Sequence, residues 1–285
     1  MSLVVAVASG KGGTGKTTVA VSLALAQRNH VQLLDCDVEE PNADIFLKPE
    51  FEKAEPVSIP VPQIDKSKCD FCGKCAQVCA YNALAVIKND VLVFTQLCHG
   101  CGGCRRLCPR QAIIEVDRNI GKIESGAAGE IQFVRGKLNV GEAMSPPLIR
   151  AVKRRISSNG LVVIDVPPGT SCPVIEAIKG SHFCILVTEP TPFGLNDLIL
   201  AVEVVRKMGV PTGVVINRAE SGYDAIDAFC KEAGIPVLLR IPFDRRIAVA
   251  YSKGIPPRFV QKDLDKQLLN MLDSIRRLSL PPENH

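Results

Sequence analysis

A glycine-rich loop near the start of the chain has the composition of a phosphate-binding site. Residues 8–20 read ASGKGGTGKTTVA and satisfy the pattern G-x4-G-K-[ST] through Gly10, Gly15, Lys16 and Thr17. Glycines let backbone N–H groups curl around an anionic phosphate, the lysine adds a positive charge, and the threonine hydroxyl can bind Mg²⁺. The residues predicted to contact the phosphates are Gly10, Gly12, Gly13, Thr14, Gly15, Lys16, Thr17 and Thr18. The alternative, a glycine-rich turn that matches by accident, is disfavoured because the loop lies between a strand-like run and a helical stretch.

A second chemical pattern lies between residues 69 and 108, where eight of the twelve cysteines gather. The spacing Cys69-x2-Cys72-x2-Cys75-x3-Cys79 recurs 29 residues later as Cys98-x2-Cys101-x2-Cys104-x3-Cys108. Three close cysteines followed by a fourth are typical of iron–sulfur ligands, whereas a zinc site usually draws two C-x2-C pairs from separated loops. The repeat predicts a duplicated iron–sulfur insert, with zinc as the disfavoured alternative. Eight cysteines leave no vacancy for His99 or His182, which we interpret as ordinary surface or packed side chains.

Charge and composition exclude several other classes of function. The net charge of +4 is spread over 34 basic and 30 acidic residues, and no basic run exceeds the triplet at 153–155, so a nucleic-acid partner is not predicted. No signal-like segment or apolar run of about 18 residues is present, so no membrane partner is predicted. The chain is expected to be cytoplasmic and reduced, where clustered cysteines favour metal binding over disulfides.

The elements that must position these residues follow from the apolar pattern. Short β-branched runs begin at residues 3, 31, 161, 183, 212 and 237, and helical stretches such as 17–28 and 195–208 lie between them. Continuous apolar runs that alternate with helices predict an α/β fold with a mostly parallel, doubly wound sheet. The alternation breaks between about residues 56 and 125, so we expect a small α+β domain over 59–122, inserted between the two parts of the main domain, 1–58 and 123–285.

The end of the chain carries a further helical pattern between residues 263 and 280. Its apolar positions are Leu264, Leu268, Leu272, Ile275 and Leu278. The polar face of this stretch is not strongly basic, so we expect it to pack on the sheet rather than to lie on a membrane surface.

The loop contains one lysine more than a phosphate site needs. The stretch K-G-G-T-G-K-T resembles the deviant Walker A loop of the MinD and nitrogenase iron-protein class of P-loop ATPases. The resemblance implies that Lys16 serves its own nucleotide, while Lys11 reaches across a homodimer interface, through the nucleotide face, to the partner's ATP. The alternative is that Lys11 is an exposed loop lysine with no such task.

Two further segments match this family in order, LLDCDVEEPN from residue 33 and VVIDVPPGT from residue 162. The resemblance implies that Asp35 lies with Thr17 near Mg²⁺, and that Asp37 lies near the attacking water. It also implies that Asp165 is the Walker B acid and that Gly169 senses a γ-phosphate through its N–H. Lys11, Lys16, Asp37 and Asp165 are thus the expected catalytic residues of a Mg²⁺-dependent ATPase. Asn217 resembles the asparagine that contacts adenine in this family, and IPFD at 241–244 lies where a second loop beside the base is expected. The resemblance covers about residues 1–50 and 130–280.

The cysteine insert resembles a bacterial two-cluster ferredoxin. In that family the fourth cysteine of each run binds the other cluster. The resemblance therefore implies one [4Fe-4S] cluster on Cys69, Cys72, Cys75 and Cys108, and a second on Cys98, Cys101, Cys104 and Cys79. Ala80 stands where Pro109 stands in the second run, which leaves the ligands intact but can loosen the first turn.

The other cysteines are Cys36, Cys172, Cys184 and Cys230. Cys184 and Cys230 lie in apolar settings and are expected to be small buried side chains. Cys172 lies seven residues after Asp165, a position similar to that of a cluster ligand in the nitrogenase iron protein. The second ligand segment of that protein has no counterpart here, so metal binding at Cys172 stays an open alternative.

Together these patterns predict an ATP-hydrolysing iron–sulfur protein. We expect nucleotide-driven dimerisation to gate electron transfer to a redox partner or the maturation of a metal centre in a client protein. An alternative is a cluster carrier or scaffold that resembles the iron–sulfur assembly ATPases of the same superfamily. A spatial positioner like MinD itself is disfavoured by the weak membrane character of the C-terminal stretch.

Overall fold

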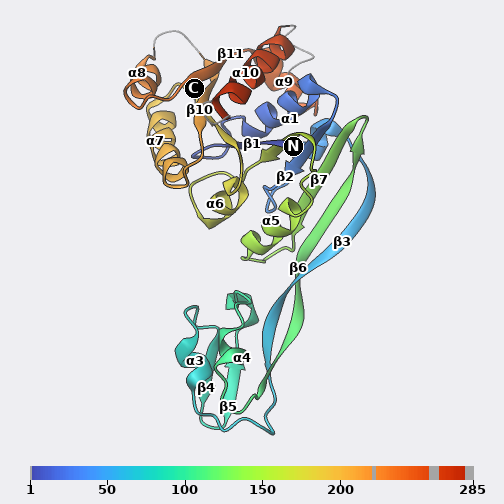
Figure 1. The fold of residues 1–285 in the computed structure, drawn as a ribbon, viewed down its shortest axis with the longest axis vertical. Coiled ribbons are helices and arrows are strands. Elements are labelled where there is room, and N and C mark those ends of the chain that lie inside the picture. Colours follow the sequence, from blue (N-terminus) through green and yellow to red (C-terminus); the bar gives the residue numbers. More distant parts are fainter. Residues whose placement is uncertain (1, 220–222, 257–262, 280–285) are drawn as a thin grey trace, which may run out of the picture.

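The apolar runs of the sequence become strands of one large sheet. The computed structural model describes residues 2–219, 223–256 and 263–279, and within them a nine-stranded sheet has the order β11-β10-β9-β1-β8-β2-β7-β6-β3. The parallel part consists of β11 (Val237–Pro242), β10 (Thr212–Ala219), β9 (Phe183–Thr188), β1 (Ser2–Ala8), β8 (Gly160–Asp165), β2 (Val31–Asp35) and β7 (Ile131–Leu138). The predicted mostly parallel α/β sheet is confirmed (Figure 1).

Helices cover both faces of this sheet. Val4 and Ala6 of β1 pack in one apolar cluster, and Val5 and Val7 in another, because successive side chains of a strand point to opposite faces. The first face is covered by α5 (Ser145–Lys153), α6 (Cys172–Ile178), α7 (Pro192–Lys207) and α8 (Ala225–Glu232). The second is covered by α1 (Lys16–Gln27), α2 (Ala43–Leu47) and α10 (Leu264–Ser279), with α9 (Arg245–Ser252) beside them.

The predicted C-terminal helix packs on the core, as expected. Leu264, Leu268, Leu272 and Ile275 are buried, whereas Leu278 is 47% exposed and lies outside the apolar stripe. The predicted end at Leu280 lies outside the described residues. No helix in the described part of the chain has the length and apolar character needed to cross a membrane.

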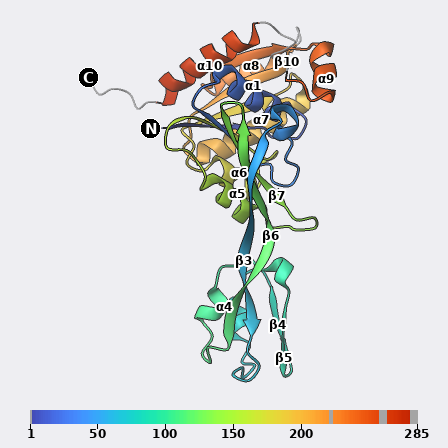
Figure 2. The same cartoon turned by 90° about the vertical axis from the view of Figure 1, so that its right-hand side faces the viewer.

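A long two-stranded arm leaves the sheet at its edge. It is formed by β3 (Glu50–Ile64) and β6 (Ile113–Ala128), which pair antiparallel from Glu50 opposite Ala127 to Ile64 opposite Ile113. Because β7 pairs only with residues 121–128 of β6, the rest of the arm is a ribbon of two strands (Figures 1 and 2). Three prolines, at positions 56, 60 and 62, fit here because an edge strand tolerates missing N–H donors. The expected domain limits at 58/59 and 122/123 therefore fall inside strands, not in linkers.

The arm carries the cysteine insert, which we define as residues 65–112. It contains α3 (Lys74–Val78), β4 (Leu84–Ile87), β5 (Asp90–Val93), η1 (Thr95–Leu97) and α4 (Gly103–Arg106), and β4 pairs with β5. Its backbone repeats at the same interval of 29 residues as its cysteines. Positive φ angles recur in three pairs: Phe71 (55°) and Gly100 (64°), Gly73 (77°) and Gly102 (71°), Asn82 (52°) and Gln111 (49°). The duplication seen in the sequence is thus also a duplication of structure.

Candidate nucleotide site and cysteine sites

A cleft of about 370 Å³ lies at the carboxyl ends of the parallel strands. It is lined by the glycine-rich loop, by Asn217 at the end of β10 and by Ile241–Asp244 at the end of β11. Ligands of open α/β sheets bind at this edge, and the volume lies within the range of small-molecule sites. The structure therefore brings together the loop, Asn217 and the 241–244 segment, which are far apart in the sequence.

Two glycines of the loop are required by close packing. A Cβ on Gly10 would lie 2.2 Å from the carbonyl oxygen of Asp197 in α7, and one on Gly15, whose φ is +93°, would lie 2.3 Å from Nδ2 of Asn217. By contrast, a Cβ on Gly12 or Gly13 would meet nothing within 4 Å. The loop is thus fixed at both ends and open in the middle, which leaves space for a phosphate chain.

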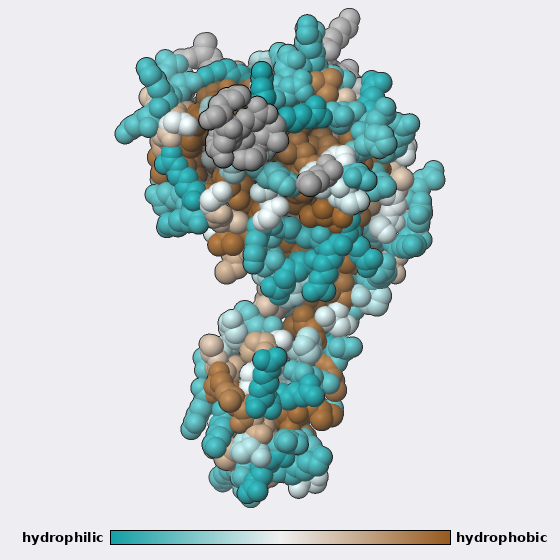
Figure 3. All heavy atoms as spheres, viewed as in Figure 1, coloured by the Kyte–Doolittle hydropathy of each residue, from teal (hydrophilic) through white to brown (hydrophobic). Residues whose placement is uncertain are grey.

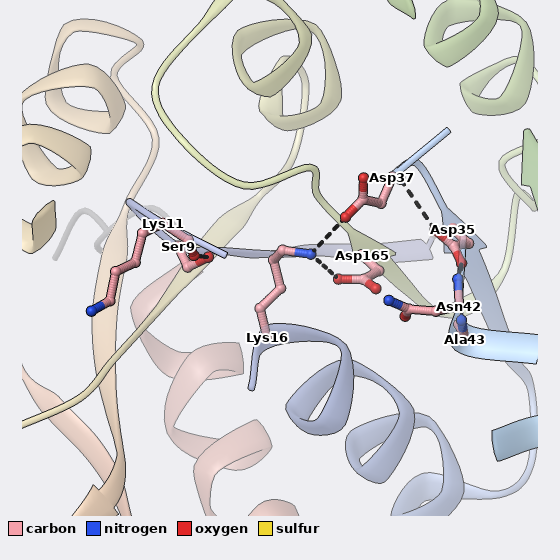
Figure 4. A network of polar contacts seen from close by, with 8 residues as sticks. All are labelled: Ser9, Lys11, Lys16, Asp35, Asp37, Asn42, Ala43 and Asp165. Atoms are coloured by element: carbon pink, nitrogen blue, oxygen red, sulfur yellow. Dashed lines mark hydrogen bonds and ion pairs between the residues drawn. The ribbon is translucent and has the colours of Figure 1, made fainter. Parts of the chain in front are cut away.

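Lys16 is the centre of a buried charge network (Figure 4). Its Nζ lies 3.2 Å from Oδ2 of Asp37 and 3.4 Å from Oδ1 of Asp165, and the residue is only 7% exposed. Burial alone would lower the pKa of Lys16, but the charges of Asp165 and Asp37 outweigh burial and raise this pKa. Lys16 is therefore a protonated cation that two carboxylates hold beside the loop.

Asp35 is used differently from its neighbours. Its Oδ1 accepts the N–H of Asp37, and its Oδ2 accepts the N–H groups of Asn42 and Ala43, all at 3.1 Å, so that it caps the start of α2. Burial, together with the charge of Asp165, raises the pKa of Asp35 well above its ordinary value. Both oxygens of this expected Mg²⁺ ligand are thus already engaged by backbone donors.

Asp165 retains one unused oxygen. Its Oδ2 is buried and has no hydrogen-bond partner within the described residues, while the hydroxyl of Thr17 bonds to the same carboxylate. Hard cations such as Mg²⁺ prefer carboxylate and hydroxyl oxygens. The residues present therefore fit a Mg²⁺ ion, and the unused oxygen adds Asp165 to the expected set of Thr17 and Asp35.

The two expected nucleotide sensors contact the chain itself. The N–H of Gly169 donates to the carbonyl oxygen of Ser9 at 3.0 Å, next to the glycine-rich loop. Asn217, predicted to contact adenine, donates from Nδ2 to the carbonyl oxygen of Thr14 at 2.8 Å. Both groups thus support the loop in this structure. Gly169 has a single N–H and would have to change partner to contact a nucleotide, whereas the Asn217 amide has a second N–H and Oδ1 besides the bond to Thr14.

Lys11 points away from Lys16 (Figure 4). Its Nζ lies 3.9 Å from Oε2 of Glu189, a carboxylate that also pairs with Arg218 at 2.5 Å. The Lys11 side chain is 34% exposed. The structure therefore separates the two loop lysines, one buried beside the carboxylates and one at the surface.

The first group of cysteines gathers at the far end of the arm. Cys69, Cys72, Cys75 and Cys108 line one pocket together with Ile64 and Ile113, where the two strands end. We name these four the distal set. They are the same four that the ferredoxin resemblance assigns to one cluster. Donation from the N–H of Ala112 to Sγ of Cys108 at 3.3 Å adds a polar contact suited to a thiolate ligand.

The second group lies nearer to the body, the part of the chain outside the arm and the insert. A Cβ on Gly100, beside Cys101, would lie 3.1 Å from the carbonyl oxygen of Pro60, so the backbone here runs close to the arm. Cys98 belongs to the apolar cluster that also contains Ile59 and the core of the body. We name Cys98, Cys101, Cys104 and Cys79 the proximal set. Burial, with Cys98 and Cys101 nearby, raises the pKa of Cys104 to about 11. Cys79 packs against the clusters that contain Cys98 and Cys104, and its Sγ accepts the N–H of Ala83 at 3.2 Å.

The donor chemistry of both sets suits iron–sulfur clusters. Each set offers four cysteine sulfurs in a largely apolar setting, as [4Fe-4S] ligation requires. No group of three or more His, Cys, Asp or Glu side chains in the described part of the chain is arranged to hold a single metal ion. A cubane is larger than one ion and takes its thiolates from farther apart.

The remaining candidate histidines and cysteines lie outside the two cysteine sets. Nδ1 of His182 accepts the N–H of Val4 at 3.0 Å, and the ring of His99 stacks on Tyr81. Cys184 and Cys230 are buried, as predicted, and burial raises the pKa of Cys184 to about 12. Cys36 is also buried, while Cys172 is exposed at the first position of α6.

Sequence reasoning missed several residues that complete these sites. Ser9 and Glu189 contact Gly169 and Lys11 only through the folded chain, and no spacing rule predicts such pairs. The ion pair of Asp70 with Arg110 at 2.8 Å could have been expected, because both residues flank ligand cysteines of the distal set.

Comparisons with known proteins agree with the fold. Residues 5–257 match the family described as the CobQ/CobB/MinD/ParA nucleotide binding domain, and the chain belongs to this family. An uncharacterized protein of Methanocaldococcus jannaschii is 32% identical over 264 residues, which cover 88% of this chain and 90% of that protein. A Pyrococcus abyssi protein named iron-sulfur cluster carrier protein is 25% identical over 272 residues, which cover 88% of this chain and 78% of that protein.

A solved structure supports the same assignment of fold. The septum site-determining protein MinD of Pyrococcus horikoshii, complexed with Mg-ADP, superposes with a TM-score of 0.59 at 18% identity, and 98% of each chain is covered. The predicted relationship to MinD-type P-loop proteins is thus confirmed at the level of family and fold.

Proposed function

We propose that this chain is a Mg²⁺-dependent ATPase whose nucleotide-driven homodimer controls two [4Fe-4S] clusters held by the insert. Its role is then to gate electron transfer to a redox partner, or the maturation of a metal centre in a client protein. The observation that carries the proposal is the presence, in one chain of this nucleotide-binding family, of the Lys16 cleft and of two four-cysteine sets on an arm.

The nucleotide half of the proposal uses the residues of the cleft. When Mg²⁺-ATP binds, its phosphates replace Asp37 and Asp165 as the partners of Lys16. Asp165 and Thr17, with Asp35 behind them, would hold Mg²⁺, and Asp37 would be free to orient the attacking water. The N–H of Gly169 leaves the Ser9 carbonyl and donates to the γ-phosphate. Such placement of cations and donors around phosphoryl oxygens is what metal-assisted transfer requires.

Lys11 supplies the contact between subunits. Its partly exposed ammonium, whose ion pair among the described residues is the 3.9 Å contact with Glu189, is available to a partner's phosphates in a face-to-face dimer. A positioned cation at developing phosphoryl charge raises the hydrolysis rate by about 10³.

The insert supplies the redox half. The distal and proximal sets would each hold one cluster, and a bound cluster supplies a low-potential one-electron carrier. The chain contributes the thiolates, the N–H donors of Ala83 and Ala112, and an apolar setting that limits water.

A polar path joins the two halves and supports control of one by the other. Asp35 caps α2, and Asp44 in α2 pairs with Nη1 of Arg135 in β7 at 2.7 Å. Nη2 of Arg135 lies 2.8 Å from Glu124, on the arm strand β6. A change of Asp35 on nucleotide binding can therefore reach residues 118–128 of β6, beside β7, which we name the root of the arm.

The test is ATP-dependent sedimentation together with an ATP hydrolysis assay. Lys11→Ala should bind ATP, fail to dimerise and lose most hydrolysis, on the order of 10³-fold. Lys16→Ala should lose nucleotide binding, and Lys207→Ala, on the exposed face of α7, is the matched control. Thermal unfolding of each variant checks that it has folded. If Lys11→Ala dimerises and hydrolyses ATP like the parent, the dimer mechanism is wrong.

A cluster carrier is the second candidate, because a relative at 25% identity bears that name. A carrier must lose its cluster to an acceptor, whereas an electron-transfer protein must keep it. The discriminating assay mixes the iron-loaded chain with an apo-ferredoxin and measures the iron that moves, with and without ATP. ATP-dependent transfer of a whole cluster supports the carrier, and retention of all iron supports the gated electron-transfer protein.

A further inference from the structure

The two cysteine sets occupy equivalent places in a duplicated backbone, so their surroundings can be compared position by position. The N–H of Asp65 donates to the carbonyl of Ala112, and 29 residues later the N–H of Phe94 donates to the carbonyl of Ala83, both at 2.8 Å. The N–H bonds to Sγ of Cys108 and of Cys79 also correspond. Hydrogen bonding to the fourth ligands thus hardly distinguishes the two sets.

The flanking side chains differ sharply at four of these equivalent positions. Around the distal set, Arg110 pairs with Asp70 at 2.8 Å, and Lys68 pairs with Asp65 at 3.2 Å. Around the proximal set the corresponding residues are aromatic or apolar: Tyr81, His99, Leu97 and Phe94. The rings of Tyr81 and His99 stack with their centroids 3.4 Å apart. Two ion pairs on one side are therefore replaced by a ring stack and two apolar side chains on the other.

Burial differs in the same direction. Cys98 and Cys104 of the proximal set are 8% and 9% exposed, whereas Cys69 and Cys75, their equivalents, are only partly buried. Cys98 of the proximal set belongs to an apolar cluster that also contains Ile59 and Val61 of the arm and the core of the body, while the distal set lies where the two arm strands end. The insert as a whole projects away from the body on the arm (Figure 3). Water and polar groups thus have better access to the distal set.

Reduction adds one negative charge to a cluster, and an apolar, less hydrated surrounding disfavours that charge. At the four positions compared, the distal ion pairs are neutral overall, so the two sets differ there in polarity and hydration rather than in net charge. Arg105 and Arg106, beside Cys104, stand where the distal repeat has Ala76 and Gln77, but both arginines are exposed and Arg105 pairs with Glu115 at 2.7 Å, so solvent and this partner screen their charge. Solvent exposure and the shell around a cluster are among the factors that set its potential.

We propose that the two cluster sites are inequivalent, with the proximal set holding the cluster of lower reduction potential, and that Tyr81, His99, Phe94 and Leu97 set this difference. This inference rests on the proposed function, since it requires a cluster at each set. These four residues are positioning residues that act through the surroundings of the ligands. The low-potential site is then the one nearer to the ATPase body.

The experiment exchanges the surroundings of the two sites in the full chain. Anaerobically reconstituted protein with about eight iron per chain is titrated with dithionite, and reduction is followed by electron paramagnetic resonance. The double variant Tyr81→Arg with His99→Asp places the distal ion pair at the proximal site. It should shift the lower midpoint potential to a more positive value, leave the upper one in place and narrow their separation.

The reciprocal variant Asp70→His with Arg110→Tyr should shift the upper potential to a more negative value. If the first variant does not hold its iron, Phe94→Asp with Leu97→Lys makes the same test with the other ion pair. Two equal potentials in the fully loaded parent, or a shift of the upper potential by either proximal variant, would overturn the inference. If the protein binds all its iron but the proximal midpoint potential is not the lower one, only this inference is wrong and the proposed function is unaffected. Failure to bind about eight iron contradicts the proposed function itself.

Discussion

In the body, strands β1, β2 and β8 bury nearly every side chain, and helices cover them on both sides. In the insert, the buried apolar side chains larger than alanine are Leu84, Val91 and two of the ligand cysteines, Cys98 and Cys104. A core of this size rarely stabilises a small domain without metal or disulfides. The body can therefore fold by burial of apolar surface, whereas we expect the insert to need the clusters that we propose its cysteines bind.

The largest expected effect follows from removal of iron. Metal binding is coupled to folding where the apolar core is small, so anaerobic chelation should abolish the hydrogen-exchange protection of residues 65–112. The body should keep its protection and its circular dichroism. Equal hydrogen-exchange protection of the insert with and without iron would contradict this difference between insert and body, because the insert would then be stable without metal.

The next largest effect is loss of one cluster through Cys79. If fourth ligands are exchanged between repeats, Cys79→Ala should reduce iron from about eight to about four per chain. Its remaining spectrum should match that of Cys101→Ala and differ from those of Cys72→Ala and Cys108→Ala. Cys230→Ala, in the body, is the control and should keep all iron. A match between Cys79→Ala and Cys72→Ala would contradict the exchange.

A substitution in the body should have a moderate effect that leaves the clusters unchanged. Leu148 of α5 is fully buried over the root of the arm, and Leu148→Ala should lower the free energy of unfolding by about 3 kcal/mol. Leu107→Ala, at a side chain 57% exposed in the insert, should change it by less than about 0.5 kcal/mol. Urea unfolding measures the change in the free energy of unfolding for each variant. Similar changes for Leu148→Ala and Leu107→Ala would argue against the view that apolar burial stabilises the body but not the insert.

The smallest expected effect is a pH dependence at the root of the arm. Burial tends to raise the pKa of Glu142, but hydrogen bonds from Arg118 and from the N–H of Met144 lower this pKa overall. A depressed pKa stabilises the folded state above the ordinary carboxyl value of 4.5, and this contribution is lost as the pH falls through the depressed value. The Arg118 and Glu142 side chains are 18% and 5% exposed, so water screens the pair only in part, and the expected contribution is about 1 kcal/mol.

The measurement is the change in unfolding free energy between about pH 6 and about pH 4, compared by urea titration. Glu142→Gln should lose less stability over this interval than the parent. Glu232→Gln, an exposed change on α8, should follow the parent. An equal loss in all three proteins would show that the Arg118–Glu142 pair does not stabilise the root of the arm.

The sequence predicted the strands of the body well because these strands are continuous apolar runs. It did not predict β3, β6 and β7. β3 contains prolines, and β6 contains glycines and charged residues, so neither segment has the apolar pattern of a buried strand. Such residues are tolerated in a strand at the edge of a sheet or in an exposed ribbon. The glycine-rich loop and its place between a strand and a helix were predicted because Gly15, Lys16 and Thr17 follow a local spacing pattern. The contacts of Gly169 with Ser9 and of Lys11 with Glu189 depend on tertiary packing, which no local pattern encodes.

The insert shows the same division. The repeat of 29 residues predicted the duplicated backbone, since ligand spacing and turn geometry are local. The difference between the Asp70–Arg110 pair and the Tyr81–His99 stack is visible only when the repeats are aligned and the contacts are known.

The most direct test of the account compares the clusters of the loaded protein in Mg²⁺-ATP and in Mg²⁺-ADP, by redox titration with paramagnetic resonance. We predict that ATP shifts at least one midpoint potential or its spectrum in the parent and in Lys207→Ala, and that Lys11→Ala shows no such shift because it cannot form the dimer. Identical potentials and spectra with both nucleotides in the parent, at full iron content and under conditions where ATP is hydrolysed, would contradict nucleotide control of the insert.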